Sequence, residues 1–583
     1  MLRKRIAGMC LLASSLALGA TLSTASTAHA QGVIDLDDDE GDGAAAQGSG
    51  GGKAGAKGKG GKDAPAEQGP VTAGQMTEDA AAAKSLFDKQ KWAEAALALH
   101  RVVAGETGDD PGNQQLAQYW LAISLYRLKF YQTSYAMFST IAANKNHLKF
   151  GQTLLWLSKL ATQLPEPAGI IDSVGRYGDE DLARFNNPQQ RDLYYQLNYL
   201  LGRYKYHHDK GYEEAIRLFN RVKPSSRYYV QSQFFSGISY VQLRKSIPAV
   251  NAFQRIETAL HEGVEGVEDE RRMQDLAYLS QARTYYSASI KLDAETNAPS
   301  IDDKKLSAAV KYWNQIDVTS EYWLDALFEE SWAYFMAGDY PRALGNIHTI
   351  EAPYFPGAFY PEAQILKAVI YFANCNYEAA TTVVARFNKK YVPIRDELKK
   401  VLKDYEGEGK SEEFYKFLLQ VQSGKADLPP AIKGIVEHSL SDRQLLRYIE
   451  YVKLLDKEKE TYDKAPGSFR TAGLGGYIQD RLGEARQNAI KQAGELAKSR
   501  YRRFISELEE HLNNGEKILI DITAAQRNLL DEKLKAGQVS AAESKIYGVV
   551  NPDEEHVIWV FDGEFWRDEL GFYRQVVQSA CGR

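Results

Sequence analysis

The stretch SWAYFMAGDYPRALGNIHTI, residues 331–350, indicates how this chain folds. Its apolar spacing predicts two short helices joined by a turn. An earlier stretch, GISYVQLRKSIPAVNAFQRI at residues 237–256, falls into register with it. The matching positions hold Ser331 and Gly237, Tyr334 and Tyr240, Ala343 and Ala249, Ile347 and Phe253, and Ile350 and Ile256. The shared pattern fixes small and large residues but no acid, base, thiol or metal ligand, so it predicts a repeated packing unit.

Small residues recur at nearly constant intervals between residues 77 and 391. Ala215 and Ala249 are 34 positions apart, Ala309 and Ala343 are again 34 positions apart, and Ala380 follows 37 positions later. A small side chain at such a position lets the second helix of a pair approach the first closely. A pair of helices this short cannot bury its apolar faces alone, so successive pairs must stack. The sequence therefore predicts an all-α solenoid.

This spacing resembles that of the tetratricopeptide repeat (TPR) family, whose unit is a helix-turn-helix of 34 residues. The resemblance covers about half of the chain. It is best at residues 230–260, 324–354 and 361–391. It implies a right-handed solenoid of about six to eight repeats, which we place at residues 76–392.

In that family, residues one step round from the packing stripe on each first helix line the concave face. The resemblance therefore assigns partner binding to twelve residues, all apolar or aromatic. They are Tyr119, Ile123, Tyr126, Phe234, Ile238, Val241, Phe328, Trp332, Phe335, Ile365, Val369 and Phe372. A contiguous apolar groove usually marks a partner site. The alternative is that neighbouring first helices, or the chain's own C-terminal helices, cover these positions.

The N-terminal residues predict export from the cytoplasm. In residues 1–30 a basic start precedes a short apolar run that ends at Ala30, which is the anatomy of a cleavable signal peptide. Residues 31–75 are first acidic and then rich in Gly and Lys, and they predict a disordered linker. No later stretch approaches the roughly 20 uncharged residues of a membrane-spanning helix. We therefore expect a periplasmic protein without a direct membrane span.

The net charge of the exported chain narrows the range of partners. Removing the three basic residues of the signal peptide from the 71 in the chain leaves 68 against 77 acidic residues, a net charge of about −9. That balance does not favour nucleic acid or an anionic lipid surface as the main partner.

The remaining cysteines, Cys375 and Cys581, could form a disulfide in an oxidising compartment. We favour two free thiols, one in a buried helix and one in the tail.

The repeat signal fades after residue 392. Residues 393–465 predict additional helices separated by Pro- and Gly-containing breaks. Residues 482–512 then keep Leu and Ala near heptad spacing under a charged surface. We expect a long helix that turns at NNGEK (residues 513–517) into a second one, as a helical hairpin or short coiled coil, within a unit spanning residues 466–583.

The stretch VIWVFDGEFW, residues 557–566, differs from everything before it. Apolar residues alternate on both sides of Asp562 and Gly563, which is a strong signal for a β-hairpin. A single hairpin is only marginally stable in water. Its aromatic face must therefore lie on the preceding helices, or it docks on another protein through Trp559, Phe561 and Trp566.

No catalytic pattern stands out. The chain has no GxSxG, HExxH, CxxC or phosphate-loop motif, and we expect no catalytic residues, no metal site and no cofactor. The layout is similar to that of periplasmic TPR components of envelope machines such as gliding motility complexes. We expect a non-enzymatic scaffold that binds other periplasmic or outer-membrane proteins. The alternatives are a chaperone-like factor for outer-membrane assembly and a cell-wall hydrolase with an unrecognised site.

Overall fold

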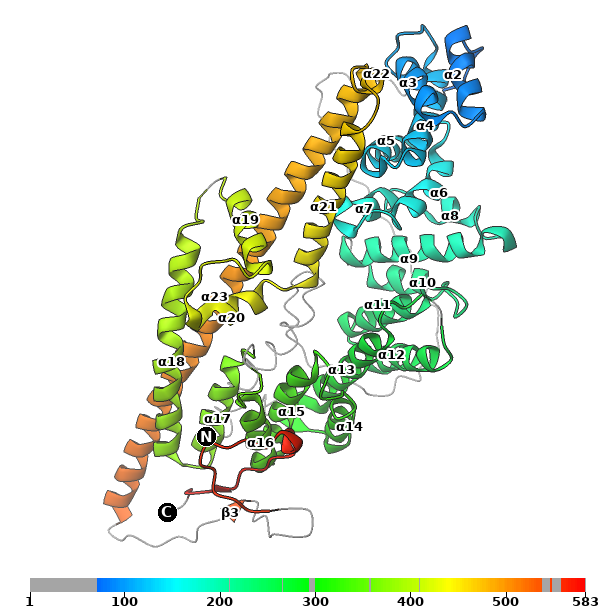
Figure 1. Cartoon of the computed structure of the whole chain (residues 1–583). Helices are drawn as coiled ribbons and strands as arrows, with labels where there is room; N and C mark the ends of the chain where they lie inside the picture. Colours follow the sequence, from blue (N-terminus) through cyan, green and yellow to red (C-terminus); the bar gives the residue numbers. More distant parts are fainter. Residues whose placement is uncertain are drawn as a thin grey trace, which may run out of the picture.

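The computed structural model describes residues 71–208, 210–264, 266–292, 299–355, 358–407, 409–536, 546–547 and 557–581. The predicted signal peptide and nearly all of the predicted linker lie outside these residues. The described chain is an all-α solenoid followed by long C-terminal helices, as the sequence predicted (Figure 1). None of its helices is both long enough and apolar enough to cross a bilayer.

The solenoid is a succession of antiparallel helix pairs. Its first half contains α2 (Glu78–Asp88), α3 (Trp92–Val103), α4 (Pro111–Arg127), α5 (Tyr131–Ala143), α6 (Phe150–Leu160), η1 (Glu166–Ala168), α7 (Ile170–Val174), α8 (Asp179–Ala183), η2 (Pro188–Gln190), α9 (Arg191–His207) and α10 (Tyr212–Phe219). Its second half contains α11 (Tyr229–Gln242), α12 (Ser246–His261), α13 (Glu270–Ser289), α14 (Asp303–Trp313), α15 (Trp323–Ala337), α16 (Tyr340–Ile350), α17 (Pro361–Ala373) and α18 (Tyr377–Lys403).

The repeated small residues lie where the helices of a pair touch, as predicted. Ala249, Ala343 and Ala380 are completely buried. Gly237 on α11 has the same role, because a Cβ atom there would overlap the ring of Phe253 on α12. Small residues on one helix thus make room for large residues on the other, and this complementarity repeats along the array.

The array is interrupted in two places. After α6, the short helices α7 and α8 replace a regular pair, where the sequence pattern is poor. Between α13 and α14, the chain forms two short antiparallel strands, β1 (Ile290–Leu292) and β2 (Pro299–Ile301), with Ile290 paired to Ile301.

Beyond the array the chain runs back along its own length. The C-terminal helices are α19 (Ser411–Gln422), α20 (Pro430–Ser439), α21 (Arg443–Asp463), α22 (Gly467–Arg470) and α23 (Gly473–Ala536). The predicted boundary at residue 392 falls inside α18, which continues through Pro393. The last helix of the array is therefore also the first of the C-terminal helices.

The predicted turn at residues 513–517 is wrong, because α23 is one continuous helix of 64 residues. At 1.5 Å per residue, its length is about 96 Å. Gly515, which suggested a turn, lies against the array instead: a Cβ atom there would be 3.3 Å from Val384 and 3.6 Å from Ile365. Its lack of a side chain permits close approach of two helices rather than a reversal of the chain.

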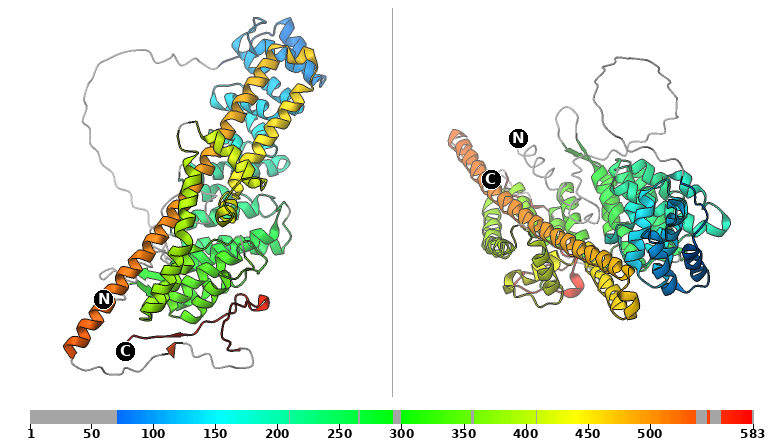
Figure 2. Two further views of the ribbon diagram at one scale, coloured as in Figure 1. Left: turned by 60° about the vertical axis from the view of Figure 1, so that its left-hand side comes forward. Right: turned by 90° about the horizontal axis from the view of Figure 1, so that it is seen from above.

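Helix α23 spans the arc of the solenoid from one end to the other (Figures 1 and 2). Its N-terminal half contacts α3 and α5 in the first repeats, and its C-terminal half contacts α17 and α18 in the last. Helices α19, α20 and α21 also pack on it. The first and last repeats are therefore joined by one helix.

Candidate protein-binding site

The twelve residues predicted to line an open concave groove lie inside the folded chain. Eight are buried: Ile123, Ile238, Phe328, Trp332, Phe335, Ile365, Val369 and Phe372. The other four, Tyr119, Tyr126, Phe234 and Val241, are half-buried. The prediction of an open apolar groove at these positions is therefore wrong, and the alternative of internal cover describes them.

Neighbouring repeats provide part of that cover. The Trp156 indole on α6 donates a hydrogen bond to the Tyr119 hydroxyl on α4 at 3.0 Å, and its ring lies 5.3 Å from the Tyr126 ring. Further along, the Phe328 and Tyr360 rings are 5.6 Å apart. These contacts join one repeat to the next and bury part of the aromatic surface.

The C-terminal helices cover at least one more of the twelve residues. Gly515 of α23 brings the helix backbone onto Ile365 of α17, one of the twelve residues. The sequence did not reveal this contact, because more than a hundred residues separate α17 from that part of α23 and no local pattern links them.

Glu458 on α21 fastens the C-terminal helices to the first repeats. Its buried carboxylate accepts hydrogen bonds from the backbone N–H groups of Gln132 (2.9 Å) and Thr133 (3.2 Å) and from the Thr133 hydroxyl (3.1 Å). These donors lie in the first turn of α5, where backbone N–H groups lack partners within the helix. Burial raises the pKa of Glu458 to about 7, although these hydrogen bonds oppose the rise. No feature of the sequence around Glu458 predicted the link.

The C-terminal strap, defined as Val557–Cys581, crosses the last repeats. The predicted β-hairpin is wrong, because residues 557–566 form no strand and the chain merely bends at Asp562 and Gly563. Further along are the short helix η3 (Arg567–Glu569) and the strand β4 (Val577–Gln578), which pairs antiparallel with β3 (Ile546–Tyr547). The apolar residues of this segment do alternate, but its two halves do not pair with each other as strands.

The strap is fastened to α16 and to the end of α17. Gly345 on α16 marks the crossing point, because a Cβ atom there would overlap the carbonyl oxygen of Tyr573. Backbone donors of the strap bind acceptors of the array: Gly571 N to Thr349 Oγ1 (3.0 Å), Gln575 N to the Pro341 carbonyl (3.0 Å) and Ala580 N to the Asn374 carbonyl (2.8 Å).

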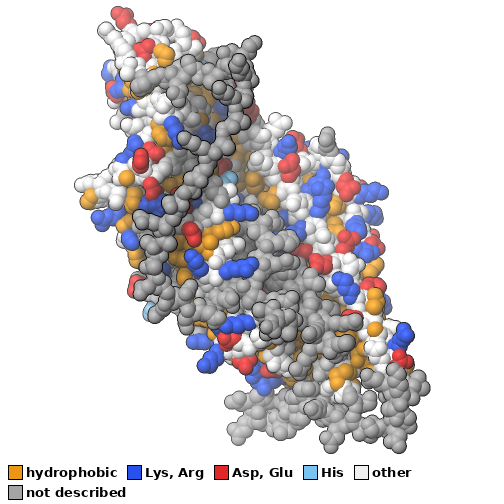
Figure 3. All heavy atoms as spheres, turned by 180° about the vertical axis from the view of Figure 1, so that it is seen from behind, with side chains coloured by type: hydrophobic (Ala, Val, Ile, Leu, Met, Phe, Trp, Pro, Cys, Tyr) orange, Lys and Arg blue, Asp and Glu red, His pale blue; other side chains and the backbone are white. Residues whose placement is uncertain are grey.

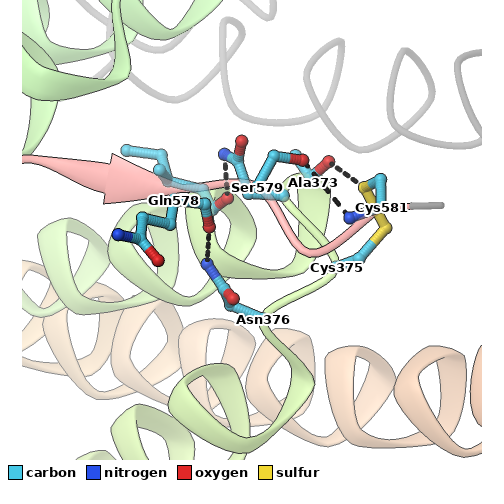
Figure 4. The surroundings of a disulfide bond; sticks show 8 residues. Ala373, Cys375, Asn376, Gln578, Ser579 and Cys581 are labelled. Atoms are coloured by element: carbon cyan, nitrogen blue, oxygen red, sulfur yellow. Dashed lines mark hydrogen bonds between the residues drawn. A yellow bond between two sulfur atoms is a disulfide. The ribbon is translucent and has the colours of Figure 1, made fainter. Parts of the chain in front are cut away.

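A disulfide closes the strap at its end (Figure 4). Cys375, just after α17, is bonded to Cys581, 206 residues later, so the expectation of two free thiols is wrong. Next to it, the Asn376 amide donates to the Gln578 carbonyl at 2.6 Å. The strap is therefore held both covalently and by hydrogen bonds.

An aromatic cluster around His348 seats the other end of the strap on α16. The imidazole ring stacks on Phe565 at 4.5 Å and meets Phe561 and Tyr573 edge-on at 4.7 and 5.0 Å. Burial, helped by the positive charge of Lys367, lowers the pKa of His348 to about 4. The imidazole is consequently neutral near pH 7 and packs as an aromatic ring. Trp559 joins the cluster at 6.4 Å from His348.

The strap carries the most concentrated exposed apolar surface of the described residues. Val557 is 77% exposed, Val560 is 90% exposed and Phe572 is 76% exposed. These belong to seven large apolar residues, the exposed strap residues, that are open to solvent within twenty positions: Val557, Ile558, Val560, Phe561, Trp566, Phe572 and Val576. Phe561 and Trp566 of the three predicted docking residues are among them, while Trp559 is half-buried.

Elsewhere among the described residues, the large exposed apolar side chains are scattered along the sequence, at Ile247, Val318, Tyr354, Leu419, Leu446, Ile520 and Leu530. On the face opposite to that of Figure 1, basic and acidic side chains are interspersed, with apolar ones in small groups (Figure 3). Within the described ranges, no group of three or more His, Cys, Asp or Glu side chains is placed to hold a metal ion. The exposed strap residues are therefore the candidate protein-binding site.

No protein-family model matches the chain, and no curated protein is significantly similar to it. Among solved structures, a "circular tandem repeat protein with novel repeat topology and enhanced subunit contact surfaces" covers 79% of this chain and 100% of its own. It has 14% identical residues and a TM-score of 0.11. At that level of similarity the match says nothing about the partners of this chain.

Proposed function

We propose that this chain is a non-enzymatic scaffold of the tetratricopeptide type that acts in the periplasm and holds other envelope proteins together. The observation that carries the proposal is the set of exposed strap residues, because a soluble protein rarely leaves so many large apolar side chains in water without a partner. The strap is fixed on the last repeats by a disulfide, so the surface is presented in a defined position.

The buried acids favour a scaffold over a hydrolase. A hydrolase needs a carboxylic acid that reaches its substrate. The carboxyl groups of Glu458 and Glu362, whose pKa is raised to about 7 and to about 8, are buried at helix contacts. Glu458 binds the first turn of α5, and Glu362 on α17 lies near Glu510 and Glu507 of α23. Their raised pKa values thus follow from packing.

The layout extends the proposal to large envelope machines, including those of gliding motility, whose periplasmic repeat components have a similar arrangement of export signal, linker and helical array. The exported location is supported by the basic start and apolar run of residues 1–30. The disulfide is consistent with an oxidising compartment.

In-cell photocrosslinking tests the proposed function. A photoreactive amino acid at Val560 is compared with one at Ile247 and one at Val318, which are exposed apolar positions on the array. We expect one or two defined adducts with envelope proteins from Val560 and none from the control positions. A broad smear of adducts from Val560 would favour the chaperone-like alternative. Fragments released from purified sacculi would favour the hydrolase, and recovery in the cytoplasmic fraction would contradict the location.

A further inference from the structure

We propose that Val557–Phe561 binds its protein partner by adding as a β-strand to the edge of a sheet whose strand is flanked by Lys or Arg. This inference rests on the proposed function, because it specifies how the exposed strap residues would recognise a partner.

The backbone of this segment has no hydrogen-bond partner among the described residues. Residues 557–561 run without a helix, turn or bend, and the first bend comes at Asp562. A row of unpaired backbone groups in a non-helical segment is a template for strand addition, in which the partner's backbone supplies the hydrogen bonds.

The side chains suit a strand and are held on one side. Val, Ile, Trp and Phe are the residues most favoured in strands. Phe561 contacts His348 on α16 at 4.7 Å, and Trp559 lies 6.4 Å from the same ring, so these two rings attach the segment to the array. Ile558 and Val560 are 60% and 90% exposed. Trp559 and Phe561 thus anchor the segment, and the alternate side chains Ile558 and Val560 are open to an incoming strand.

Charge decides what kind of strand fits. Residues 551–569 contain seven acidic residues and one basic one, Arg567, while the five residues of the segment itself carry no charge. A second copy of this chain would bring the same acidic flanks and be repelled, and an anionic membrane would be repelled as well. A partner strand with Lys or Arg at its ends would be attracted. The charges therefore favour a basic-edged protein partner over self-association or lipid.

The experiment uses the full-length oxidised chain and three synthetic peptides. The first is a strand of alternating Thr and Val with two Lys at each end; the second carries Glu in place of Lys; the third is the Lys peptide with alternate backbone nitrogens methylated, which removes the hydrogen bonds of one edge. Binding is measured by titration at low and high salt, and amide hydrogen exchange reports on residues 557–561.

We expect the Lys peptide to slow amide exchange within residues 557–561 at least tenfold and to bind more weakly at high salt. The Glu and methylated peptides should bind at least tenfold more weakly. Val560→Lys should abolish binding of the Lys peptide, whereas Val576→Lys, also exposed and on the strap, should preserve it. These substitutions replace exposed side chains, so the fold should tolerate both.

Three results would overturn the inference: equal binding of the methylated peptide, protection that appears outside residues 557–561, or protection by phosphatidylglycerol vesicles or by self-association while the Lys peptide has no effect. If defined crosslinks from Val560 are obtained in cells but the Lys peptide does not bind, strand addition is wrong and the scaffold function stands. If Val560 gives no defined crosslinks in cells and the Lys peptide does not bind, both strand addition and the proposed scaffold function are wrong.

Discussion

Glu362, at the start of α17, is a residue whose ionisation is strongly changed by the fold. Burial and the nearby carboxylates of Glu510 and Glu507 on α23 raise its pKa to about 8, from an ordinary value of about 4.5. The folded chain therefore holds this carboxyl protonated at neutral pH. Its stabilising contribution is complete below the unfolded pKa and is lost as the pH rises toward 8.

Replacing Glu362 with Gln should remove this pH dependence. The amide keeps the shape of the protonated acid but cannot ionise, so Glu362→Gln should stabilise the fold at pH 8, by up to about 4 kcal/mol, and change it little at pH 5. Urea unfolding at both pH values measures the difference. Glu516→Gln, at an exposed position of α23, is the control. Identical pH dependence of Glu362→Gln and the parent chain would contradict the assignment.

Gly345 on α16 is expected to control seating of the strap. Gly345→Ala should place a methyl group on the Tyr573 carbonyl oxygen and lift the strap without disturbing α16, because Ala favours a helix. Hydrogen exchange of the Gln575 amide should then accelerate at least tenfold. The matched control is Gly483→Ala on α23, where a Cβ atom would meet nothing within 4 Å. It should instead stabilise the protein by about 0.5–1 kcal/mol. Unchanged exchange at Gln575 in Gly345→Ala would refute the crossing.

At the scale of elements, α23 shows what a sequence pattern cannot decide. The pairing of helices in the array was predictable, because Ala249 and Ala343 repeat a contact made within one pair of neighbouring helices. The continuity of α23 was not, because Asn-Asn-Gly is locally a good turn and only the contact of Gly515 with Val384 and Ile365 explains it as helix.

A spin-label distance distinguishes a continuous helix from a hairpin. Labels at Ser499 and Gln526, both exposed, are separated by 27 residues, which is about 40 Å along a straight helix. A hairpin turning at Gly515 would bring them within about 15 Å of each other, given helix axes about 10 Å apart. Pulsed electron paramagnetic resonance should give a distance distribution with one peak near 40 Å. A dominant short distance would restore the hairpin.

The strap illustrates the same limit for the candidate site. The sequence marked residues 557–566 as unlike the rest of the chain, with docking on another protein as one of two alternatives. It could not supply the position of the strap, which depends on Gly345, His348 and a disulfide to Cys375, all of them distant in sequence. An alternating pattern predicts strand propensity, but a strand forms only where a partner strand is present.

Loss of the disulfide should release the strap while leaving the helices folded. In the chain-entropy picture, a crosslink across 206 residues contributes about 5 kcal/mol. In the double variant Cys375→Ser with Cys581→Ser, the backbone amide protons of residues 571–580 should therefore exchange with solvent much faster. The helical circular dichroism signal should be unchanged. The oxidised parent chain is the control, and its reduction by dithiothreitol should reproduce the effect. Equal exchange in all three samples would show that the noncovalent contacts are sufficient.

At the scale of the whole molecule, the residues assigned to a concave groove are covered in part by neighbouring repeats and, at Ile365, by the return of the chain along its own array. The resemblance indicated which faces of the first helices would be apolar. It could not indicate that neighbouring repeats and α23 would cover them, because that depends on the path of residues 393–536. The free apolar surface consequently lies at the strap rather than in the groove.

Glu458 tests how far the returning helices fix the first repeats. Glu458→Ala leaves the buried N–H groups of Gln132 and Thr133 without acceptors, at a cost of about 1–3 kcal/mol. We expect faster exchange of these two amides and a larger radius of gyration by small-angle X-ray scattering. Glu460→Ala, exposed on the same helix, should change neither. An unchanged radius of gyration in both variants would mean that α23 alone holds the two ends of the array together.

The length of α23 has a mechanical meaning. A solenoid with free ends stretches like a spring, because each repeat rotates slightly on the next. A single rigid rod fastened near both ends of the arc opposes such stretching, since the rod cannot elongate without losing its hydrogen bonds. Helix α23 would bear tension applied between the first and last repeats before the solenoid unwinds. The molecule would therefore keep a fixed length under load.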